Sequence, residues 1–233
     1  LSDIAKPGFV TVLDISYLGR MGGYDVRSLI VGIIARRLLQ ERTLYTTMEM
    51  QAQAGMINSS EAVAAASTSY PLVYMLIDEA HLFLPSSMEV PSSKPLIDWI
   101  KLGRHPGLSL VLATQEPSAL HETAIRQSDI IIAHNLTAES DLEALKRARQ
   151  SFMKAKSLDE MVATMESRRG LAIVFDDKTR KMLYCRIRPR RTLHTGIDAN
   201  LLTYVQIQSG DTETDVKGKE EAQDDGKKGI RIL

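Results

Sequence analysis

The length and charge balance of the chain limit what it can be. Its 233 residues, 44% of them apolar, suffice for one large domain or at most two small ones, and 29 basic residues balance 29 acidic ones. The chain as a whole therefore has no net positive charge that would by itself indicate binding to nucleic acid. The single cysteine, Cys185, excludes an intrachain disulfide and a cysteine-rich zinc site. No apolar run approaches the roughly 20 residues that span a bilayer, and we see no signal peptide, so we expect a cytoplasmic protein without a membrane partner.

The first third of the chain predicts a strand, a turn and a long helix. Residues 8–16, "GFVTVLDIS", alternate and are rich in β-branched side chains, which favours a strand. The glycine-rich "LGRMGGYD" that follows has no Lys-Ser or Lys-Thr after its glycines, so it is a turn and not a phosphate loop. Apolar residues recur at helical spacing from Val26, with Asp25 as the N-cap, and residues 44–68 predict more helix and a mobile loop.

The middle of the chain alternates apolar runs with amphipathic segments. Residues 72–77, 108–114 and 129–135 predict three strands, of which the first two read as fully buried. Between them, "PLIDWIKLGR" predicts a short helix with proline in its first turn, and "PSALHETAIRQS" predicts another. A helix from about residue 138, capped by Thr137, and one opened by "SLDE" follow.

The C-terminal part changes character twice. Residues 170–188 predict a β-hairpin, and residues 209–233 are so polar and charged that we expect a flexible tail after a domain of residues 1–208. Strands that alternate with helices predict an α/β fold with a parallel sheet covered by helices on both faces, and the hairpin adds antiparallel strands at one edge.

Two adjacent carboxylates end the first apolar strand of the middle region, in "VYMLIDEAH". Ligands of such sheets bind at the carboxyl ends of the strands. Asp78 there suits a magnesium ion, directly or through its waters, and Glu79 suits the handling of an attacking water. The alternative is a strand that simply ends in acids before a turn. His81 beside the pair is expected to couple the strand end to the next segment and not to bind metal.

Three further segments carry polar groups that suit phosphate chemistry. "LVLATQEPS" places Thr114 and Gln115 at the end of the next strand, where a glutamine can hydrogen-bond a γ-phosphate or the lytic water. Arg104 in "KLGRHPG" lies in a rigid turn and can stabilise a phosphate, unless it is a solvated surface arginine. "RIRPRRTLHTG", which contains Arg190 and His194, can meet phosphates of a nucleotide or of DNA, or be a basic surface strand.

The order of these segments resembles the ATPase domain of the HerA/FtsK superfamily, most of all the archaeal HerA-type bipolar DNA helicases. The resemblance runs from about residue 8 to 196 and is strongest in "LIDEAHLFLP" and "GRHPGLSLVLATQEPSAL", followed by "SD.IIAHNLT…D". It implies a RecA-like fold, ATP and magnesium as cofactors, DNA as partner and a homo-hexameric ring. Members of this group include HerA itself, which works with the nuclease NurA in DNA end resection.

The resemblance also implies roles for individual residues. Asp78 corresponds to the magnesium-binding aspartate, Glu79 to the catalytic glutamate and Gln115 to the nucleotide sensor. Arg104 corresponds to an arginine finger offered to the neighbouring subunit, and Arg190 and His194 fall in a basic segment near the nucleotide. An ATP hydrolase that translocates DNA, in end processing or repair, is therefore the expected function.

The chain departs from the family pattern in one respect: no G-x-x-x-x-G-K-[ST] phosphate loop occurs in the 233 residues. We therefore interpret the chain as the C-terminal portion of such an ATPase, inactive alone, with the loop upstream of Leu1. The alternative is a degenerate, non-hydrolysing assembly module. A third interpretation is a helicase of the DEAH-box superfamily, but such helicases have a Ser-Ala-Thr motif where this chain has "ATQ".

Overall fold

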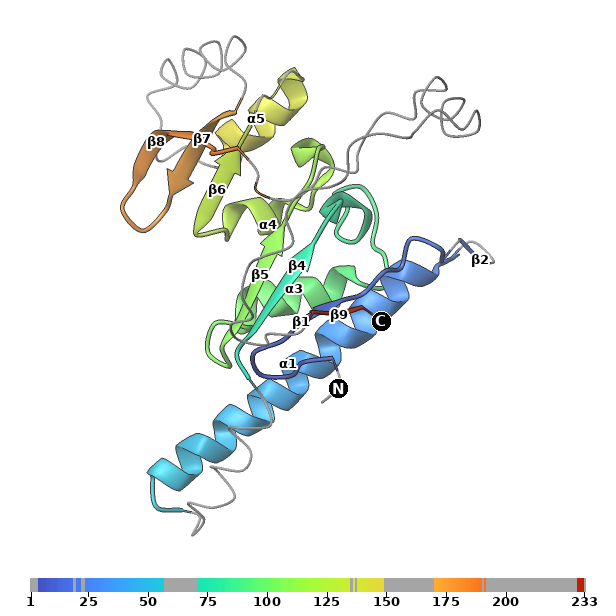
Figure 1. The fold of residues 1–233 in the computed structure, drawn as a ribbon, viewed down its shortest axis with the longest axis vertical. Coiled ribbons are helices and arrows are strands. Elements are labelled where there is room, and N and C mark those ends of the chain that lie inside the picture. The colour runs from blue at the N-terminus through green and yellow to red at the C-terminus, as the bar shows by residue number, and fades with distance from the viewer. Residues whose placement is uncertain are drawn as a thin grey trace, which may run out of the picture. The chain divides into compact units, whose positions relative to one another are not determined.

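The computed structural model describes residues 4–18, 20–21, 24–56, 71–134, 136, 138–148, 170–189, 191 and 230–232 (Figure 1). The chain divides into two compact units, Leu1–Arg186 with Lys228–Leu233, and Ile187–Lys227. The elements in chain order are β1 (Val10–Val12), β2 (Arg20–Met21), β3 (Tyr24–Asp25), α1 (Val26–Gln53), β4 (Val73–Ile77), η1 (Ala80–Leu82), α3 (Ser93–Leu102), β5 (Leu108–Leu112), η2 (Pro117–Ala119), α4 (Glu122–Arg126), β6 (Ile130–Ala133), α5 (Glu139–Ala148), β7 (Leu171–Asp176), β8 (Lys181–Arg186) and β9 (Ile230–Ile232). The predicted α/β class is confirmed.

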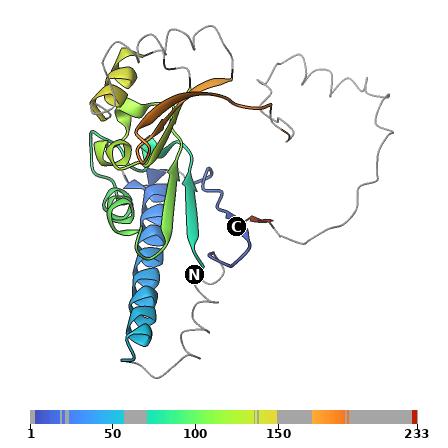
Figure 2. The same cartoon turned by 90° about the vertical axis from the view of Figure 1, so that its left-hand side faces the viewer.

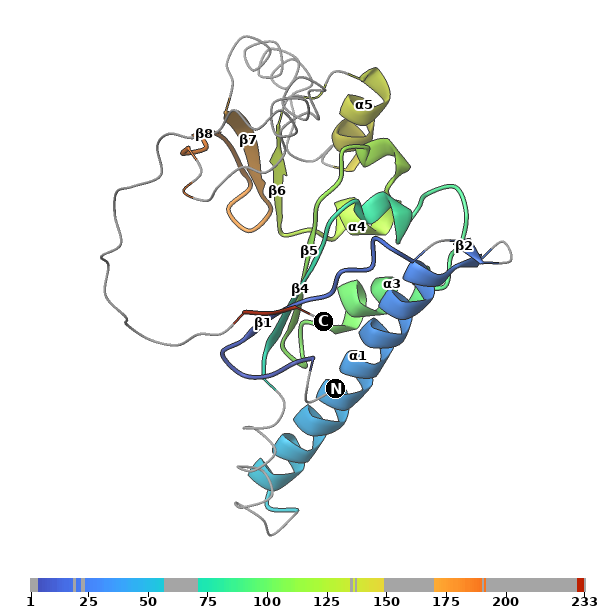
Figure 3. The ribbon, with the colours of Figure 1, turned by 45° about the vertical axis from the view of Figure 1, so that its right-hand side comes forward.

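The parallel pairing at the centre of the first unit joins β4 to β5. Their register runs from Val73 opposite Leu108 to Ile77 opposite Leu112, so both strands end at the same edge. Helices α1 and α3 lie on one side of this pair, as Figure 2 and Figure 3 show. The apolar core contains residues of both helices and both strands, with Trp99 only 1% exposed.

Strand β4 is buried on one face only, which corrects the prediction of a fully buried strand. Ile77 lies in the core, whereas Tyr74 and Leu76 are 71% and 72% exposed. Successive side chains of a strand point to opposite faces, so a strand covered on one face alternates between core and solvent. The continuous apolar run in the sequence hides this alternation, because exposed and buried positions carry equally apolar residues.

The third predicted strand does not extend the parallel pair, so the prediction that it belongs to the parallel sheet is wrong. Strand β6 pairs antiparallel with β7, from Ile130 opposite Asp176 to Ala133 opposite Ile173, and β7 pairs antiparallel with β8. The hairpin β7–β8 was predicted, and its strand β7 uses its other edge to bind β6. Side chains of β6 alternate between faces, so Ala133 lies in the core while Ile130 and Ile132 stay exposed.

The segment predicted as one helix over 117–128 is two short pieces. The 3-10 turn η2 ends at Ala119, and the next residue, Leu120, has extended backbone angles and forms a bridge with Pro85. Helix α4 then begins after His121, whose ring nitrogen accepts a hydrogen bond from the Thr123 N–H at 3.2 Å. The extended residue between the two pieces explains why helical spacing alone misled the prediction.

The two ends of the sequence contribute short strands. Strand β1 is three residues long, shorter than predicted, and pairs parallel with β9 at the end of the predicted tail. The rest of that tail, the "SLDE" helix and Thr137 lie outside the described residues. Cys185 lies exposed on β8, opposite the fully buried Ala172 of β7. No helix in the described part of the chain combines the length and the apolar character needed to cross a bilayer.

A close contact fixes α1 against the segment that leads from η1 to α3. The hydroxyls of Ser28 and Ser92, both fully buried, lie 2.7 Å apart, and Ser92 donates to the Phe83 carbonyl at 2.6 Å. A Cβ added to Gly32 would lie 2.7 Å from the Pro91 carbonyl oxygen, closer than side chains tolerate. This contact places the segment after Glu79 at a defined position on α1.

Asp25 caps α1, as predicted, and its loss should destabilise the fold. Its carboxylate accepts the Arg27 N–H at 3.1 Å and pairs with the Arg27 guanidinium at 3.0 Å. We expect Asp25→Ala to lower the free energy of unfolding by about 1 kcal/mol at pH 7, measured by denaturant titration.

The pH dependence of this effect has a defined sign. The hydrogen bonds from Arg27 hold the pKa of the Asp25 carboxyl below its ordinary value, so the contribution is present above the unfolded pKa. It is lost as the pH falls through the lowered folded pKa, and the Asp25→Ala penalty should shrink there. Asp25→Asn, which keeps a capping oxygen, is the matched control and should cost less at pH 7.

Candidate active site

The carboxyl ends of β4 and β5 meet at one point, as the parallel register requires. The Ala113 N–H donates to the Ile77 carbonyl at 2.9 Å, and the Ala80 N–H donates to the Ala113 carbonyl at 2.8 Å. These two bonds continue the pairing past the strand ends. They bring the segments Asp78–Glu79 and Thr114–Gln115 side by side, although 36 residues separate Glu79 from Gln115.

Glu79 and Gln115 are in direct contact. The Gln115 side-chain amide nitrogen donates to Oε1 of Glu79 at 2.8 Å, and the Glu79 side chain is 38% exposed. A carboxylate and an amide at the mouth of two parallel strands, open to solvent, can together hold a water molecule or a phosphate oxygen. The structure thus brings together two residues that the sequence singled out separately.

The backbone of Glu79 adopts the left-handed conformation, with φ 47° and ψ 49°. Its N–H donates to Oδ1 of Asp78 at 3.0 Å, and the 3-10 turn η1 begins at the next residue. A non-glycine residue with positive φ stores strain, and such residues are concentrated at functional sites. The conformation turns the chain sharply as it leaves β4.

This strain predicts a stability difference between two variants that both lack the carboxylate. Glycine adopts positive φ without cost, so Glu79→Gly should be more stable than Glu79→Ala by about 1 kcal/mol, measured by denaturant unfolding. The matched control is Glu116, which is exposed and has φ −122°. At position 116 the order should reverse, and the same order at both positions would contradict the strain argument.

His81 and Thr114 form a second link between the two strand ends. Nδ1 of His81 lies 3.0 Å from Oγ1 of Thr114 and 3.6 Å from Oε2 of Glu79. Oγ1 of Thr114 also accepts the Glu116 N–H at 3.1 Å. His81 therefore links the segment after β4 to the end of β5 through Thr114, whereas the sequence suggested a link to the segment that follows its own strand.

Asp78 has the chemistry that a magnesium ion needs. Its carboxylate is exposed at the strand end, and Oδ1 accepts the Glu79 N–H. Magnesium in phosphate sites is bound by one or two carboxylates together with phosphate oxygens and water, so a lone aspartate fits. Among the residues that the structure describes, no group of three or more potential metal ligands occurs.

Arg104 lies at the opposite end of β5 from Gln115. It is exposed in the turn between α3 and β5, where its carbonyl accepts the Gly107 N–H at 3.3 Å. Five residues of β5 separate this turn from the strand end, a length of about 16 Å at 3.3 Å per residue. The structure therefore does not bring Arg104 to the Glu79 site of its own chain.

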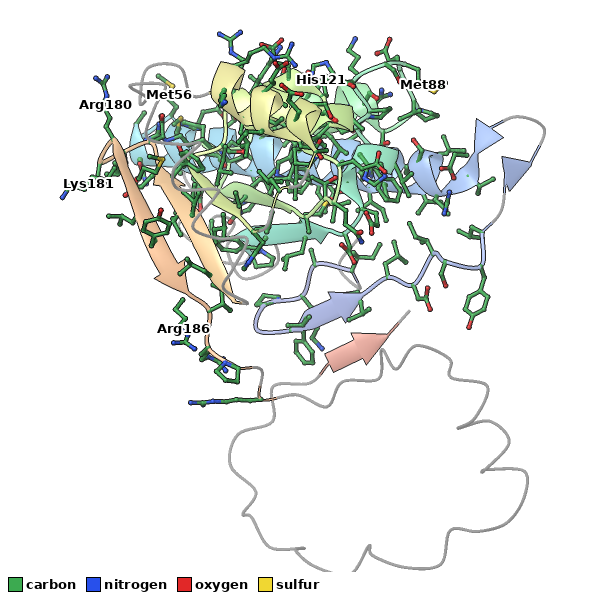
Figure 4. All side chains as sticks on the ribbon, turned by 90° about the horizontal axis from the view of Figure 1, so that it is seen from above. Met56, Met88, His121, Arg180, Lys181 and Arg186 are labelled. Atoms are coloured by element: carbon green, nitrogen blue, oxygen red, sulfur yellow. The ribbon has the colours of Figure 1, made fainter. Side chains whose placement is uncertain are left out.

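The remaining basic candidates fall partly outside the described residues. Arg190 and His194 are not described, and the neighbouring Arg186, Arg188 and Arg191 are exposed. Figure 4 shows Arg186 at the end of β8, with Arg180 and Lys181 at the turn of the hairpin. The placement of Arg190 and His194 near a nucleotide stays a prediction.

Asp141 holds the loop after Gln115, a role that the sequence analysis did not predict. Asp141 is 9% exposed on α5, and its Oδ1 accepts the Ser118 N–H of η2 at 2.9 Å. It is the final aspartate in "SD.IIAHNLT…D", so the motif was the available signal. Ser28 and Ser92 were also missed, because 64 residues separate them and neither belongs to a motif.

Comparison with known proteins agrees with the resemblance seen in the sequence. A curated relative, the DNA double-strand break repair helicase HerA of Pyrococcus furiosus, is 22% identical over 158 residues, covering 64% of this chain and 28% of the relative. The chain thus spans less than a third of that protein's length.

Solved structures of a viral protein are similar to part of the chain. The genome packaging NTPase B204 from Sulfolobus turreted icosahedral virus 2 with ATP-gammaS has a TM-score of 0.44 and 21% identity, over 55% of this chain and 59% of that one. The structure of the same NTPase with AMPPCP has a TM-score of 0.43 and 21% identity, over 55% of this chain and 61% of that one.

The model of one protein family matches most of the chain. That family is described as helicase HerA-like C-terminal, and the match spans residues 15–184 of 233. The matched region includes Asp78, Glu79, Arg104 and Gln115, and it ends within β8. The chain therefore belongs to the helicase HerA-like C-terminal family.

Proposed function

We propose that the chain is the C-terminal portion of an ATP-driven DNA translocase or helicase of HerA type that acts in DNA end processing or repair. The observation that carries this proposal is the 2.8 Å contact between Glu79 and Gln115 at the carboxyl ends of two parallel strands. Membership of the HerA-like family and the printed name of the Pyrococcus relative support it.

In this proposal three residues at the strand ends divide the work of ATP hydrolysis. Glu79 orients the attacking water and accepts its proton, and Gln115 binds the γ-phosphate or that water. Asp78 holds magnesium, which neutralises charge on the phosphates when bound. Because the Gln115 amide donates to Glu79 in the structure described, a γ-phosphate would compete with Glu79 for that donor. Gln115 can thereby report whether ATP is present.

The phosphate loop and the assembly belong to the proposed longer protein. The loop supplies backbone N–H groups, a lysine and a hydroxyl for the phosphates and the metal, and the 233 residues contain no such motif. We place the loop upstream of Leu1. We further propose a homo-hexameric ring around DNA, Arg104 donated between subunits, and a NurA-type nuclease as partner.

A non-hydrolysing assembly module is the second candidate, and the missing loop motif favours it. Two findings decide between the candidates: the sequence upstream of Leu1, and the ATPase activity of the full-length protein with and without double-stranded DNA. We expect an upstream G-x-x-x-x-G-K-[ST] and hydrolysis that DNA stimulates. A full-length protein without the motif and without hydrolysis would establish the assembly module instead.

The 233-residue chain alone should bind ATP weakly and hydrolyse it negligibly. The exposed side chains of Asp78, Glu79 and Gln115 cannot replace the backbone donors and the lysine of a phosphate loop. Isothermal titration calorimetry with magnesium-ATP measures the affinity, and phosphate release measures turnover. Micromolar binding by this chain would contradict the assignment of the main phosphate contacts to another segment.

A further inference from the structure

We infer that His81 is a positioning residue for Glu79. Its ring carries a proton on Nδ1, and this N–H edge holds the orientation of the Glu79 carboxylate when Gln115 turns to contact a ligand. The catalytic part of this inference rests on the proposed function. Its structural part, the position of the ring proton, can be measured independently.

The ring of His81 lies between two side chains that come from different strand ends. Its Nδ1 is 3.0 Å from Oγ1 of Thr114 and 3.6 Å from Oε2 of Glu79, and the side chain is 17% exposed. The first distance is a hydrogen bond and the second is an electrostatic contact. Both involve the same ring nitrogen.

The surroundings of this nitrogen determine where the ring proton sits. If Nδ1 had no hydrogen, its lone pair would face the Glu79 carboxylate at 3.6 Å, which is repulsive. With a hydrogen on Nδ1, the ring donates to Thr114 and turns its positive edge to Glu79. Oγ1 of Thr114 has two lone pairs and accepts both His81 and the Glu116 N–H. The Nδ1–H form therefore satisfies both neighbours.

This arrangement gives each carboxylate oxygen of Glu79 its own neighbour. Oε1 accepts from Gln115, and Oε2 faces His81. If Gln115 turns to a γ-phosphate, Oε1 loses its donor, whereas the contact with His81 remains. Since Thr114 precedes Gln115 on the chain, His81 ties the orientation of Glu79 to the same strand end that carries the sensor.

Two amide substitutions separate this role from a general structural one. The side-chain nitrogen of asparagine lies close to the position of Nδ1, whereas that of glutamine lies close to Nε2. In the full-length protein we expect His81→Gln to lower kcat for ATP by about 10- to 100-fold, with KM within about twofold, because the carboxylate is misdirected. His81→Asn should retain most of the kcat.

The result that would overturn the catalytic role is equal loss in both variants, or no loss in His81→Gln, provided that the wild-type protein hydrolyses ATP. Thermal unfolding of both variants shows whether either loss reflects folding. A wild-type full-length protein without any hydrolysis would instead refute the proposed function, which this design keeps separate.

Nuclear magnetic resonance of the 233-residue chain tests the proton position without any enzyme assay. Nitrogen-15 shifts of the His81 ring distinguish the two neutral forms, because the protonated and the unprotonated nitrogen of an imidazole resonate at different shifts. The signal is assigned by its loss in His81→Asn. We expect Nδ1–H, and we expect Thr114→Val to weaken this preference. A ring protonated only at Nε2 would overturn the inference.

Discussion

Glu79→Gln in the full-length protein is expected to stop ATP turnover while ATP stays bound. The substitution keeps the size of the side chain and its reach to Gln115, but it removes the charge that we propose orients the water and accepts its proton. Loss of a general base typically lowers the rate by about 10²–10⁴-fold. Phosphate release measures turnover, and retention of a fluorescent ATP analogue measures binding.

Glu116→Gln is the matched control for this variant. Glu116 is an exposed carboxylate directly after Gln115, and the hydrogen bonds described for it use only its backbone N–H and carbonyl. Its substitution removes the same charge within the same loop, and turnover should be unchanged. Wild-type turnover by Glu79→Gln would reject the catalytic assignment, and equal loss in both variants would assign the effect to the net charge of the loop.

Arg104→Ala is expected to abolish hydrolysis and to leave ring assembly and nucleotide binding nearly intact. The structure places Arg104 exposed at the far end of β5, away from Glu79 of its own chain. In the proposed ring, Arg104 would therefore meet the nucleotide of a neighbouring subunit. An arginine finger contributes about 10³–10⁵-fold to turnover. Lys101→Ala is the control, because Lys101 is another exposed cation in the last turn of α3.

Mixing two inactive variants tests whether Arg104 acts between subunits. In rings of Arg104→Ala and Glu79→Gln subunits, some interfaces combine an intact Glu79 with an intact Arg104 from the neighbour. Those interfaces should restore part of the activity. If Arg104 acts within its own subunit, no mixture restores activity, and mass measurement confirms that mixed rings had formed.

The sequence predicted the position of the candidate site better than its details. Polar residues after consecutive apolar runs were enough, because parallel strands end at the same edge of a sheet and so bring Glu79 and Gln115 together. The N-cap at Asp25 and the hairpin β7–β8 were likewise local patterns. Local patterns are readable because a few neighbouring residues determine them.

Features that depend on distant residues were not predictable. The positive φ of Glu79 lies directly before the Ala80 N–H, which donates to the distant Ala113 carbonyl, and no residue preference signals either feature. The exposure of Tyr74 and Leu76 depends on which face the helices cover. The pairing of β6 with β7 likewise depends on which strand edge is free, and apolar runs look the same in either arrangement.

The exposed thiol on β8 makes the protein convenient to observe. Cys185 is the only cysteine among the 233 residues, and it is exposed, so a maleimide dye would attach to this chain at one known position. A donor on some copies and an acceptor on others would give energy transfer when copies assemble. Subunit exchange could then be followed in real time, without removing any native residue.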